Sequence, residues 1–178
     1  MHAFVDESRR NDTYYLAAAI VDPKDLTVLR KRLGGLLLPG QYELHFKKEM
    51  PSRRKEILSR LVEWQAKAVI HQASCGRDVE AARQACVARL AEDLIDVNCV
   101  RLVLDSREER DVFDMRTIRT TLGKYPRASG FIYEHMSSTR ESLLWIADAV
   151  AWSHGAGGDW ARRVRPVVEE VVWVDIRP

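Results

Sequence analysis

Apolar and polar residues alternate along the chain with two periods, one typical of strands and one typical of helices. Short apolar runs rich in β-branched or aromatic residues predict strands. We expect strands at 3–7, 13–21, 68–74, 100–105, 131–136 and 171–176. Apolar residues three or four positions apart predict amphipathic helices. We expect helices at 22–33, 51–67, 78–96, 110–122, 143–154 and 159–170. The alternation of strands and helices predicts an α/β domain with a central mixed sheet.

Turn and capping residues indicate where some of these elements begin and end. A polar turn at 9–12 separates the first two strands, which therefore predict a hairpin. Ser138 and Glu141 form the S-x-x-E pattern of a capping box just before the apolar helix at 143–154. Pro166 is expected to break the last helix, because proline removes a helical hydrogen bond.

Composition restricts the class of protein. The chain is 46% apolar and 30% charged, values typical of one globular domain, here residues 1–178. Its apolar stretches are far shorter than the roughly 18 residues of a membrane span, and the N-terminus has no secretory pattern, so we expect a cytoplasmic protein. The three cysteines form no CxxC pair, which disfavours a disulfide framework or a zinc knuckle. The net charge of +2 indicates no particular partner.

Two of the predicted strands end on an aspartate. The run AFVD ends at Asp6, and the run VRLVLD ends at Asp105. Open α/β sheets bind their ligands beyond the carboxyl ends of the strands. If these two strands are parallel neighbours, they lie about 4.8 Å apart and their end carboxylates repel each other, which a divalent cation would relieve. The alternative is that each aspartate only caps a turn.

A third acid, Asp148, lies inside the apolar segment LLWIADAVAW at 143–152. An ionised carboxylate in such surroundings is costly unless it has a partner or a metal. The nearest basic residue before it is Arg140, eight positions earlier, which is more than one helical turn away. Asp148 is therefore expected to reach a distant cation, a group of hydrogen-bond donors or a metal. The alternative is a narrow solvent-facing stripe on this helix.

Together these segments resemble DUF3800, a widespread bacterial family of unassigned function related to the ribonuclease H-like superfamily. The matching segments extend over about 85% of the chain and begin with FVDES at 4–8 and the strand YYLAAAIV. They continue with ELHF at 43–46, the strand that ends at Asp105 and the helix LLWIADAVAW. The resemblance implies a ribonuclease H-like mixed β-sheet with helices on both faces. One departure is Arg9-Arg10, where many relatives have a glycine after DES.

The resemblance also implies a chemistry. In the superfamily, acids on the first strand, the fourth strand and a late helix bind Mg²⁺ or Mn²⁺ for phosphodiester cleavage. The corresponding positions are Asp6, Asp105 and Asp148, and Glu43 matches an extra acid of the family. The implied protein is a metal-dependent nuclease with these four carboxylates as ligands and catalytic groups. Two such ions activate a water and stabilise the leaving oxygen, and Asp6, in the stiff centre of the sheet, is expected to bridge them.

Two further residues are expected to support this site. Glu7 follows Asp6 in a strand and therefore points to the opposite face, where it acts as a support or as a cap. His45 lies two residues after Glu43, in a segment at 42–46 that is expected to be extended or irregular. If the segment is extended, both side chains point the same way, and His45 can position a water or a phosphate. The alternative is an ordinary packed or exposed histidine.

A basic run follows ELHF directly and supplies candidates for nucleic-acid binding. These candidates are Lys47, Lys48, Arg53, Arg54 and Lys55. If ELHF borders the site, they can hold a DNA or RNA backbone by charge; the alternative is a solvated helix face. The sequence shows no aromatic platform for stacking single-stranded bases. The alternative function is a non-catalytic module on the same fold that binds nucleic acid or a protein partner, which the small net charge favours.

Overall fold

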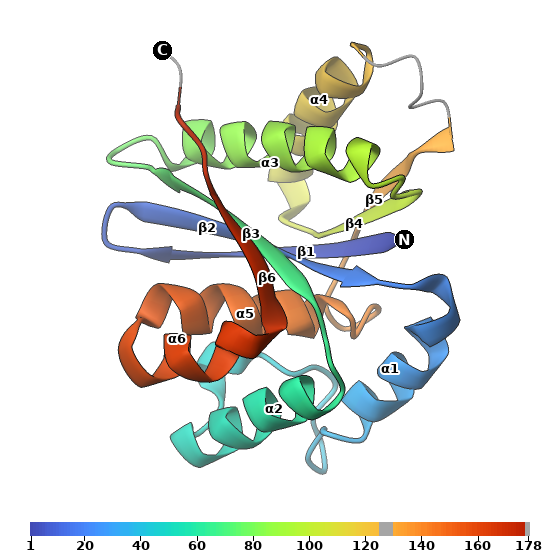
Figure 1. Cartoon of the computed structure of the whole chain (residues 1–178), viewed down its shortest axis with the longest axis vertical. Coiled ribbons are helices and arrows are strands. Elements are labelled where there is room, and N and C mark those ends of the chain that lie inside the picture. Colours follow the sequence, from blue (N-terminus) through green and yellow to red (C-terminus); the bar gives the residue numbers. More distant parts are fainter. Residues whose placement is uncertain (125–129, 177–178) are drawn as a thin grey trace.

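A six-stranded mixed sheet forms the centre of the computed structural model, which describes residues 1–124 and 130–176 (Figure 1). The strands are β1 (His2–Arg10), β2 (Thr13–Val21), β3 (Ala68–Ser74), β4 (Arg101–Asp105), β5 (Ile132–Met136) and β6 (Val168–Trp173). Their order across the sheet is β5-β4-β1-β2-β3-β6. β1 pairs antiparallel with β2, and β2 pairs antiparallel with β3. β4 runs parallel to β1, β5 parallel to β4 and β6 parallel to β3. The predicted β1–β2 hairpin is confirmed.

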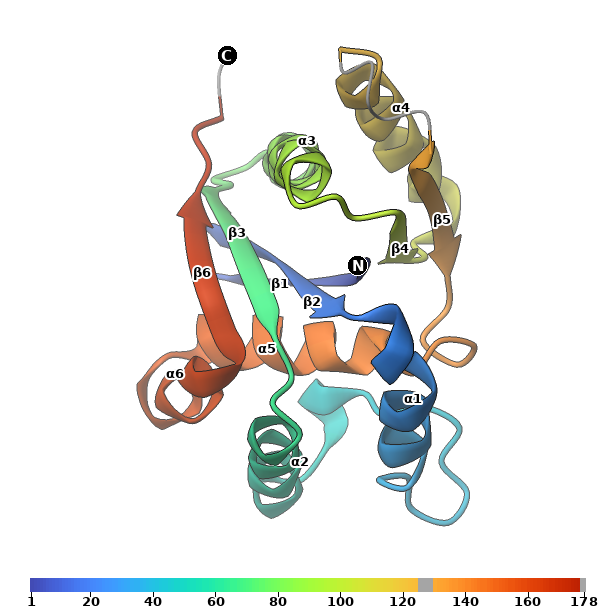
Figure 2. The same ribbon diagram turned by 45° about the vertical axis from the view of Figure 1, so that its right-hand side comes forward.

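Helices cover both faces of this sheet (Figure 2). The α-helices are α1 (Leu26–Gly34), α2 (Pro51–Glu63), α3 (Val79–Asp96), α4 (Asp111–Leu122), α5 (Leu144–Ala156) and α6 (Gly158–Val164). Four short 3₁₀ turns are η1 (Pro23–Asp25), η2 (Phe46–Lys48), η3 (Glu108–Arg110) and η5 (Arg165–Val167). α3 and α4 lie on one face, and α5 lies on the other with α1, α2 and α6 outside it (Figure 1). The predicted α/β class, with a mixed sheet and helices on both faces, is confirmed.

Successive residues of β1 belong to two different hydrophobic cores. Phe4 packs in the core on the α5 face, whereas Ala3 and Val5 pack in the core on the α3 face. All three side chains are almost fully buried, which makes β1 a central strand covered on both sides. The next two residues of the strand are Asp6 and Glu7, so strand alternation sends their carboxylates to opposite faces.

α5 is buried on nearly all sides, as its uniformly apolar sequence predicts. Trp145, Ile146 and Val150 are at most 4% exposed. The helix lies between the sheet and the outer helices, close to β1 and β2 (Figure 2). Within the described residues, no helix combines the length and the apolar composition that crossing a bilayer requires.

Some element ends differ from the sequence-based expectation. α2 ends at Glu63 rather than near 67, and Gln65 at φ 54° turns the chain toward β3. The last helix, expected at 159–170, is only the seven-residue α6. Pro166 lies in the turn η5, and the valine-rich segment after it pairs with β3 as β6, which therefore begins at Val168 and not at 171.

The expected capping box before α5 is wrong. The N-cap residue of α5 is Leu143, and no side chain caps it. The Ser138 hydroxyl instead donates to the Glu43 carboxylate. Glu141 accepts from the backbone N–H of Leu143 at 3.2 Å and forms an ion pair with Arg30 at 2.6 Å. Both polar side chains therefore connect the segment before α5 to distant parts of the chain.

Candidate functional site

β1 and β4 bring two of the predicted acids together, although only one of these acids ends its strand. Asp105 is the last residue of β4, whereas Asp6 lies in the middle of β1, which continues to Arg10 instead of ending near 7. The strands pair in parallel, with Phe4 beside Val103 and Val5 beside Leu104. The next step of this register places Asp6 beside Asp105, at the spacing of neighbouring strands, about 4.8 Å. The condition under which the two end carboxylates were expected to converge, that these strands are parallel neighbours, is therefore met.

Two other segments add their acids to the same place. α5 crosses β1 and carries Asp148, and the irregular segment before η2 carries Glu43 and His45. A cavity of about 330 Å³, here called the acidic pocket, contains all of them. Its lining residues are Asp6, Glu7, Glu43, Leu44, His45, Asp105, Ser138, Trp145 and Asp148. The structure thus places the four predicted carboxylates and both predicted support residues around one cavity.

Backbone and hydroxyl groups donate to the carboxylates of the pocket, and the backbone of Ser138 acts on Asp105 in this way. Asp6 Oδ1 accepts from the backbone N–H of Glu7 at 2.7 Å, and Glu43 accepts from the Ser138 hydroxyl. Asp148 Oδ2 accepts from the backbone N–H of Phe46 at 2.8 Å. These bonds use one oxygen of each carboxylate, and the described residues offer no hydrogen-bond donor to the other oxygen of Asp6, Glu43 or Asp148.

Asp148 has polar partners outside its own apolar helix. Its side chain is 15% exposed and lies 3.5 Å from Nδ1 of His45. The groups that face Asp148 are thus the Phe46 N–H and His45, both from the segment before α2. Among the described Lys and Arg side chains, none is a partner of Asp148. The hydrogen bond to Asp148 raises the pKa of His45, and the negative charge of Asp148 acts in the same direction.

The pocket disfavours the ionised forms of its central acids. Burial, followed by the negative charges of Glu7, Asp148 and Asp105, raises the pKa of Asp6 well above its usual value. Burial, followed by Glu7 and Asp148, raises the pKa of Asp105 to about 6. Carboxylates gathered without a cation repel one another, and each proton taken up relieves part of that repulsion.

The donor set suits a hard divalent cation, although the side chains are not arranged around one. Within residues 1–124 and 130–176, no three His, Cys, Asp or Glu side chains are placed to hold a metal ion as they stand. One oxygen of Asp148 and one of Glu43 accept from protein donors instead, from the Phe46 N–H and the Ser138 hydroxyl. Carboxylate oxygens are nevertheless the ligands that Mg²⁺ and Mn²⁺ prefer.

On the opposite face of β1, the sequence analysis missed a buried ion cluster. Glu7 points there, as strand alternation predicts, and pairs with Arg83 of α3. Arg83 also binds both carboxylate oxygens of Asp114 of α4, at 2.9 and 2.7 Å, and both side chains are at most 1% exposed. Arg107 and His135 contact the same aspartate at 3.1 and 3.2 Å. Glu7, Arg83, Arg107, Asp114 and His135 are here called the buried ion cluster.

The predicted nucleic-acid-binding run divides into two groups. The three lysines, Lys47, Lys48 and Lys55, are exposed. Arg53 is 14% exposed and forms an ion pair with Glu56 at 2.7 Å. Arg54 donates to the backbone carbonyls of Phe46 and Lys47, so it anchors the segment that carries Glu43 and His45. The lysines are thus the members of the run whose charges face solvent.

Comparison with known proteins supports the fold. No protein-family model matches the chain, and no curated protein matches it, so the resemblance to DUF3800 stays a prediction. Among solved structures, the chain is similar to the ribonuclease HII in the structure of the PCNA:RNase HII complex from Archaeoglobus fulgidus. The match has a TM-score of 0.56 and 19% sequence identity, and it covers 85% of this chain and 70% of that one. The chain therefore has a ribonuclease H-like fold, similar to that of ribonuclease HII.

Proposed function

We propose that the protein is a divalent-metal-dependent nuclease that hydrolyses phosphodiester bonds in the acidic pocket. One observation carries this proposal: four carboxylates from four separate segments meet in a cavity that no Lys or Arg lines. Structural acids in a fold are normally paired with cations, as Asp114 is with Arg83. Asp105 ends β4, and open α/β sheets bind their ligands beyond the carboxyl ends of the strands, so a group of acids without such a partner at this place favours a ligand-binding site.

Asp6, Asp105 and Asp148 are the residues that would hold Mg²⁺ or Mn²⁺, with Glu43 as a further ligand or as the group that orients a water. A bound divalent cation supplies Lewis-acid activation of water and stabilises the leaving oxygen of a phosphodiester. The protein's part is to position these groups: the sheet fixes Asp6 and Asp105, and α5 fixes Asp148. Coordination would replace the hydrogen bonds that Asp148 and Glu43 now accept.

His45 and Ser138 are positioning residues of the proposed site. Asp148 raises the pKa of His45 and so favours the protonated ring, with Nδ1 facing Asp148. A protonated His45 adds a positive charge beside the acidic side chains of the pocket. This charge would attract an incoming phosphate. Ser138 holds Glu43 by its hydroxyl. The exposed Lys47 and Lys48 lie two and three residues after His45, so their charges are close to the pocket along the chain.

Cleavage of labelled oligonucleotides with Mn²⁺ or Mg²⁺ tests the proposal. Single-stranded, duplex and hybrid substrates should be assayed with wild type, Asp148→Asn and the control Asp159→Asn. Asp159 is an exposed carboxylate of α6 outside the pocket. We expect Asp148→Asn to lose at least about a hundredfold in rate, the equivalent of about 3 kcal/mol of transition-state stabilisation. Asp159→Asn should retain the wild-type rate.

A second function is favoured by the finding that, within the part of the chain that the structure describes, no three side chains are set to hold an ion. It is the non-catalytic nucleic-acid-binding module on the same fold. In that case cleavage remains at background in both metals while oligonucleotide binding persists. Equal cleavage by wild type and Asp148→Asn would also contradict the nuclease assignment, because the activity would then come from elsewhere.

A further inference from the structure

Two arginines and two tryptophans from four segments gather on one surface. The Arg54 guanidinium of α2 lies 4.4 Å from the ring centroid of Trp152 of α5. The guanidinium of Arg10, at the end of β1, lies 5.4 Å from the same ring. Trp160 of α6 meets Trp152 edge to face at 5.6 Å. These four residues are here called the Arg–Trp surface, and its two indoles are only partly buried.

This surface continues directly from the acidic pocket. Asp148 and Trp152 are one turn apart on α5, about 6 Å along the helix. Asp6 and Arg10 lie on the same face of β1, because alternate residues of a strand share a face, and they are about 13 Å apart along it. The two elements that carry the acids thus also carry the Arg–Trp surface. A stacked nucleic-acid strand rises 3.4 Å per nucleotide, so these spacings correspond to about two to four nucleotides.

The positive charges of this surface are not neutralised by neighbouring acids. Among the described residues, neither Arg10 nor Arg54 lies within 4 Å of a carboxylate, in contrast to Arg53, Arg83 and Arg107. Two of the Arg54 guanidinium nitrogens donate to backbone carbonyls, and its central carbon lies over the indole of Trp152. Uncompensated arginines on aromatic rings provide both contacts that a single strand needs, which are charge for the phosphates and a flat face for the bases.

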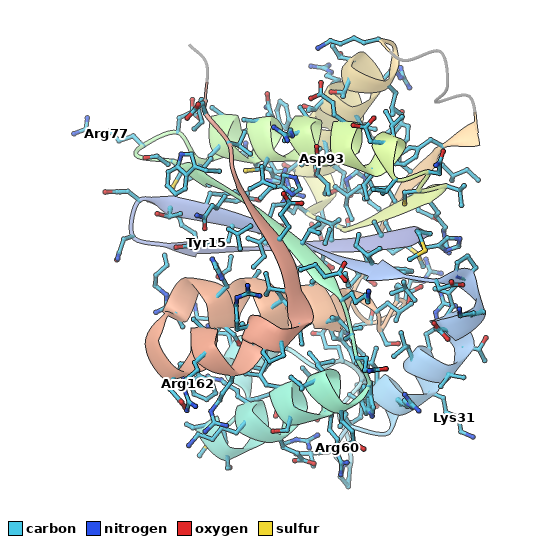
Figure 3. The ribbon with its side chains drawn as sticks, in the orientation of Figure 1. Tyr15, Lys31, Arg60, Arg77, Asp93 and Arg162 are labelled. Atoms are coloured by element: carbon cyan, nitrogen blue, oxygen red, sulfur yellow. The ribbon has the colours of Figure 1, made fainter. Side chains whose placement is uncertain are left out.

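A further pair of rings lies close to this surface along α5. Tyr15 of β2, labelled in Figure 3, meets His154 of α5 edge to face at 5.5 Å, two residues beyond Trp152. Arg162 of α6, labelled in the same figure, is paired with Asp159. The sequence showed no aromatic platform, because Arg10, Arg54 and Trp152 are far apart along the chain.

We propose that the Arg–Trp surface binds a single-stranded segment of the nucleic acid whose phosphodiester lies in the acidic pocket. Arg10 contacts a phosphate, and Trp152 with Trp160 stacks an unpaired base. This rests on the proposed nuclease function for the role of the pocket, but the binding itself needs no metal. Duplexes bind less well at this surface because their bases are stacked on one another and do not expose a face.

Binding of a fluorescent thymidine 12-mer in metal-free buffer tests the contribution of charge. The matched pair is Arg10→Gln and Arg9→Gln, which remove the same charge from adjacent residues on opposite faces of β1. Arg9 donates to the carbonyls of Asn11 and Gly76, away from the Arg–Trp surface. Arg10→Gln should lower the magnitude of the slope of log K against log salt by about 0.7, the loss of one phosphate contact. Arg9→Gln should leave the slope unchanged; equal slopes for both variants would overturn the proposal.

An abasic 12-mer of the same length tests the contribution of stacking. Wild type should bind the thymidine oligomer about tenfold more tightly than the abasic one. Trp152→Leu should lose this preference while keeping the wild-type salt slope, and Trp152→Phe should restore most of it. Both tryptophans pack partly against the core, so the Tm of each variant is measured as a control, and Trp160→Leu provides a second variant with the same expected direction. If wild type binds both oligomers equally, the stacking contact does not exist and the proposal fails.

The outcome of this test is separable from that of the nuclease assignment. Hydrolysis of bis(p-nitrophenyl) phosphate with Mn²⁺ reports on the acidic pocket without a strand to bind. If this hydrolysis depends on Asp148 while the Arg10 and Trp152 variants bind oligomers like wild type, only the surface proposal is wrong. If oligomer binding depends on Arg10 and Trp152 while no phosphodiester is cleaved, the surface proposal holds and the nuclease assignment fails.

Discussion

Asp6 and Glu7 are neighbours in one strand, yet they belong to two regions with opposite electrostatics. Asp6 faces the acidic pocket, where burial and the charges of Glu7, Asp148 and Asp105 raise its pKa. Glu7 reaches the buried ion cluster on the other face, where Arg83 supplies the positive charge. Among the described residues, the lining of the acidic pocket gathers acids without a Lys or Arg, whereas the opposite face of β1 encloses its cation within the fold.

Asp114 shows what a carboxylate in this fold looks like when its role is structural. Burial alone would raise its pKa, but the hydrogen bonds from His135 and Arg83 outweigh that effect and hold the pKa below its usual value. Asp105, at the end of the strand next to β1, has its pKa raised to about 6. Fully paired acids stabilise one structure, whereas acids that repel one another are suited to bind a cation from solution.

The largest effect should come from removing the cation of the buried ion cluster. Arg83→Met leaves Asp114 and Glu7 without their main partner, and we expect the free energy of unfolding in urea to fall by about 3–5 kcal/mol. The matched control is Arg89→Met on the same helix, where the partly exposed pair with Asp93 should contribute less than about 1 kcal/mol. Equal losses in the two variants would show that the cluster has no special structural role.

Metal should stabilise the acidic pocket and leave the buried ion cluster unaffected. At Mn²⁺ ten times above its Kd, mass action stabilises the folded state by about 1.4 kcal/mol, which is about 3–6 °C in Tm for a chain of this size. Asp6→Asn should remove most of this shift, and it should raise the Tm measured in EDTA because one repelling charge is gone. A wild-type Tm that is indifferent to millimolar Mn²⁺ would contradict the metal site.

The smallest effect concerns the pH dependence of Asp105. Its folded pKa of about 6 lies above the unfolded value of 3.8, so the folded state binds the extra proton between these values and loses stability as pH rises through 6. In metal-free buffer, Asp105→Asn should change stability little at pH 4. Above pH 7 it should stabilise the protein by about 1 kcal/mol, a value reduced from the full shift because the side chain is partly exposed.

Asp159→Asn is the control of opposite sign for this pH series. Hydrogen bonds from Arg163 and Arg162 lower the pKa of Asp159, so its contribution to stability is present above the unfolded pKa and lost as pH falls. Any measurable effect of Asp159→Asn should therefore be a loss of stability that vanishes at low pH. If Asp105→Asn destabilises the metal-free protein at pH 8, the carboxylates do not repel one another as described.

The parts of the fold that the sequence predicts are those set by local patterns. The hairpin of β1 and β2 and the buried helix α5 agree with the structure because apolar runs, their periods and the polar turn between the strands indicate them, whereas the parallel pairing of β1 with β4 entered only as a condition. The final helix and strand were misplaced because Pro166 and the valines after it favour different structures, and pairing with β3 decided between them.

The acids that follow apolar runs and the family resemblance predicted the carboxylates of the candidate site. They did not predict the hydrogen-bond and ion-pair partners of these and neighbouring residues. Ser138 was assigned to a helix cap because the S-x-x-E pattern is local, whereas its actual partner is Glu43, 95 residues earlier. The pairing of Arg83 with Asp114 depends on how α3 packs against α4, and the spacing of apolar residues along the chain does not indicate which helices pack together. The contact of Arg54 with Trp152 is equally long-range.

The most direct test of the central claim is a Mn²⁺ titration of wild type, Asp6→Asn and Glu7→Gln, followed by electron paramagnetic resonance of the free ion. The two variants each neutralise one acid at neighbouring positions of the same strand. We expect wild type to bind Mn²⁺, Asp6→Asn to bind at least about tenfold more weakly, the equivalent of about 1.4 kcal/mol, and Glu7→Gln to stay within about threefold of wild type. Absence of Mn²⁺ binding by wild type, or equal losses in the two variants, would contradict the division of β1 into a cation-binding face and a structural face.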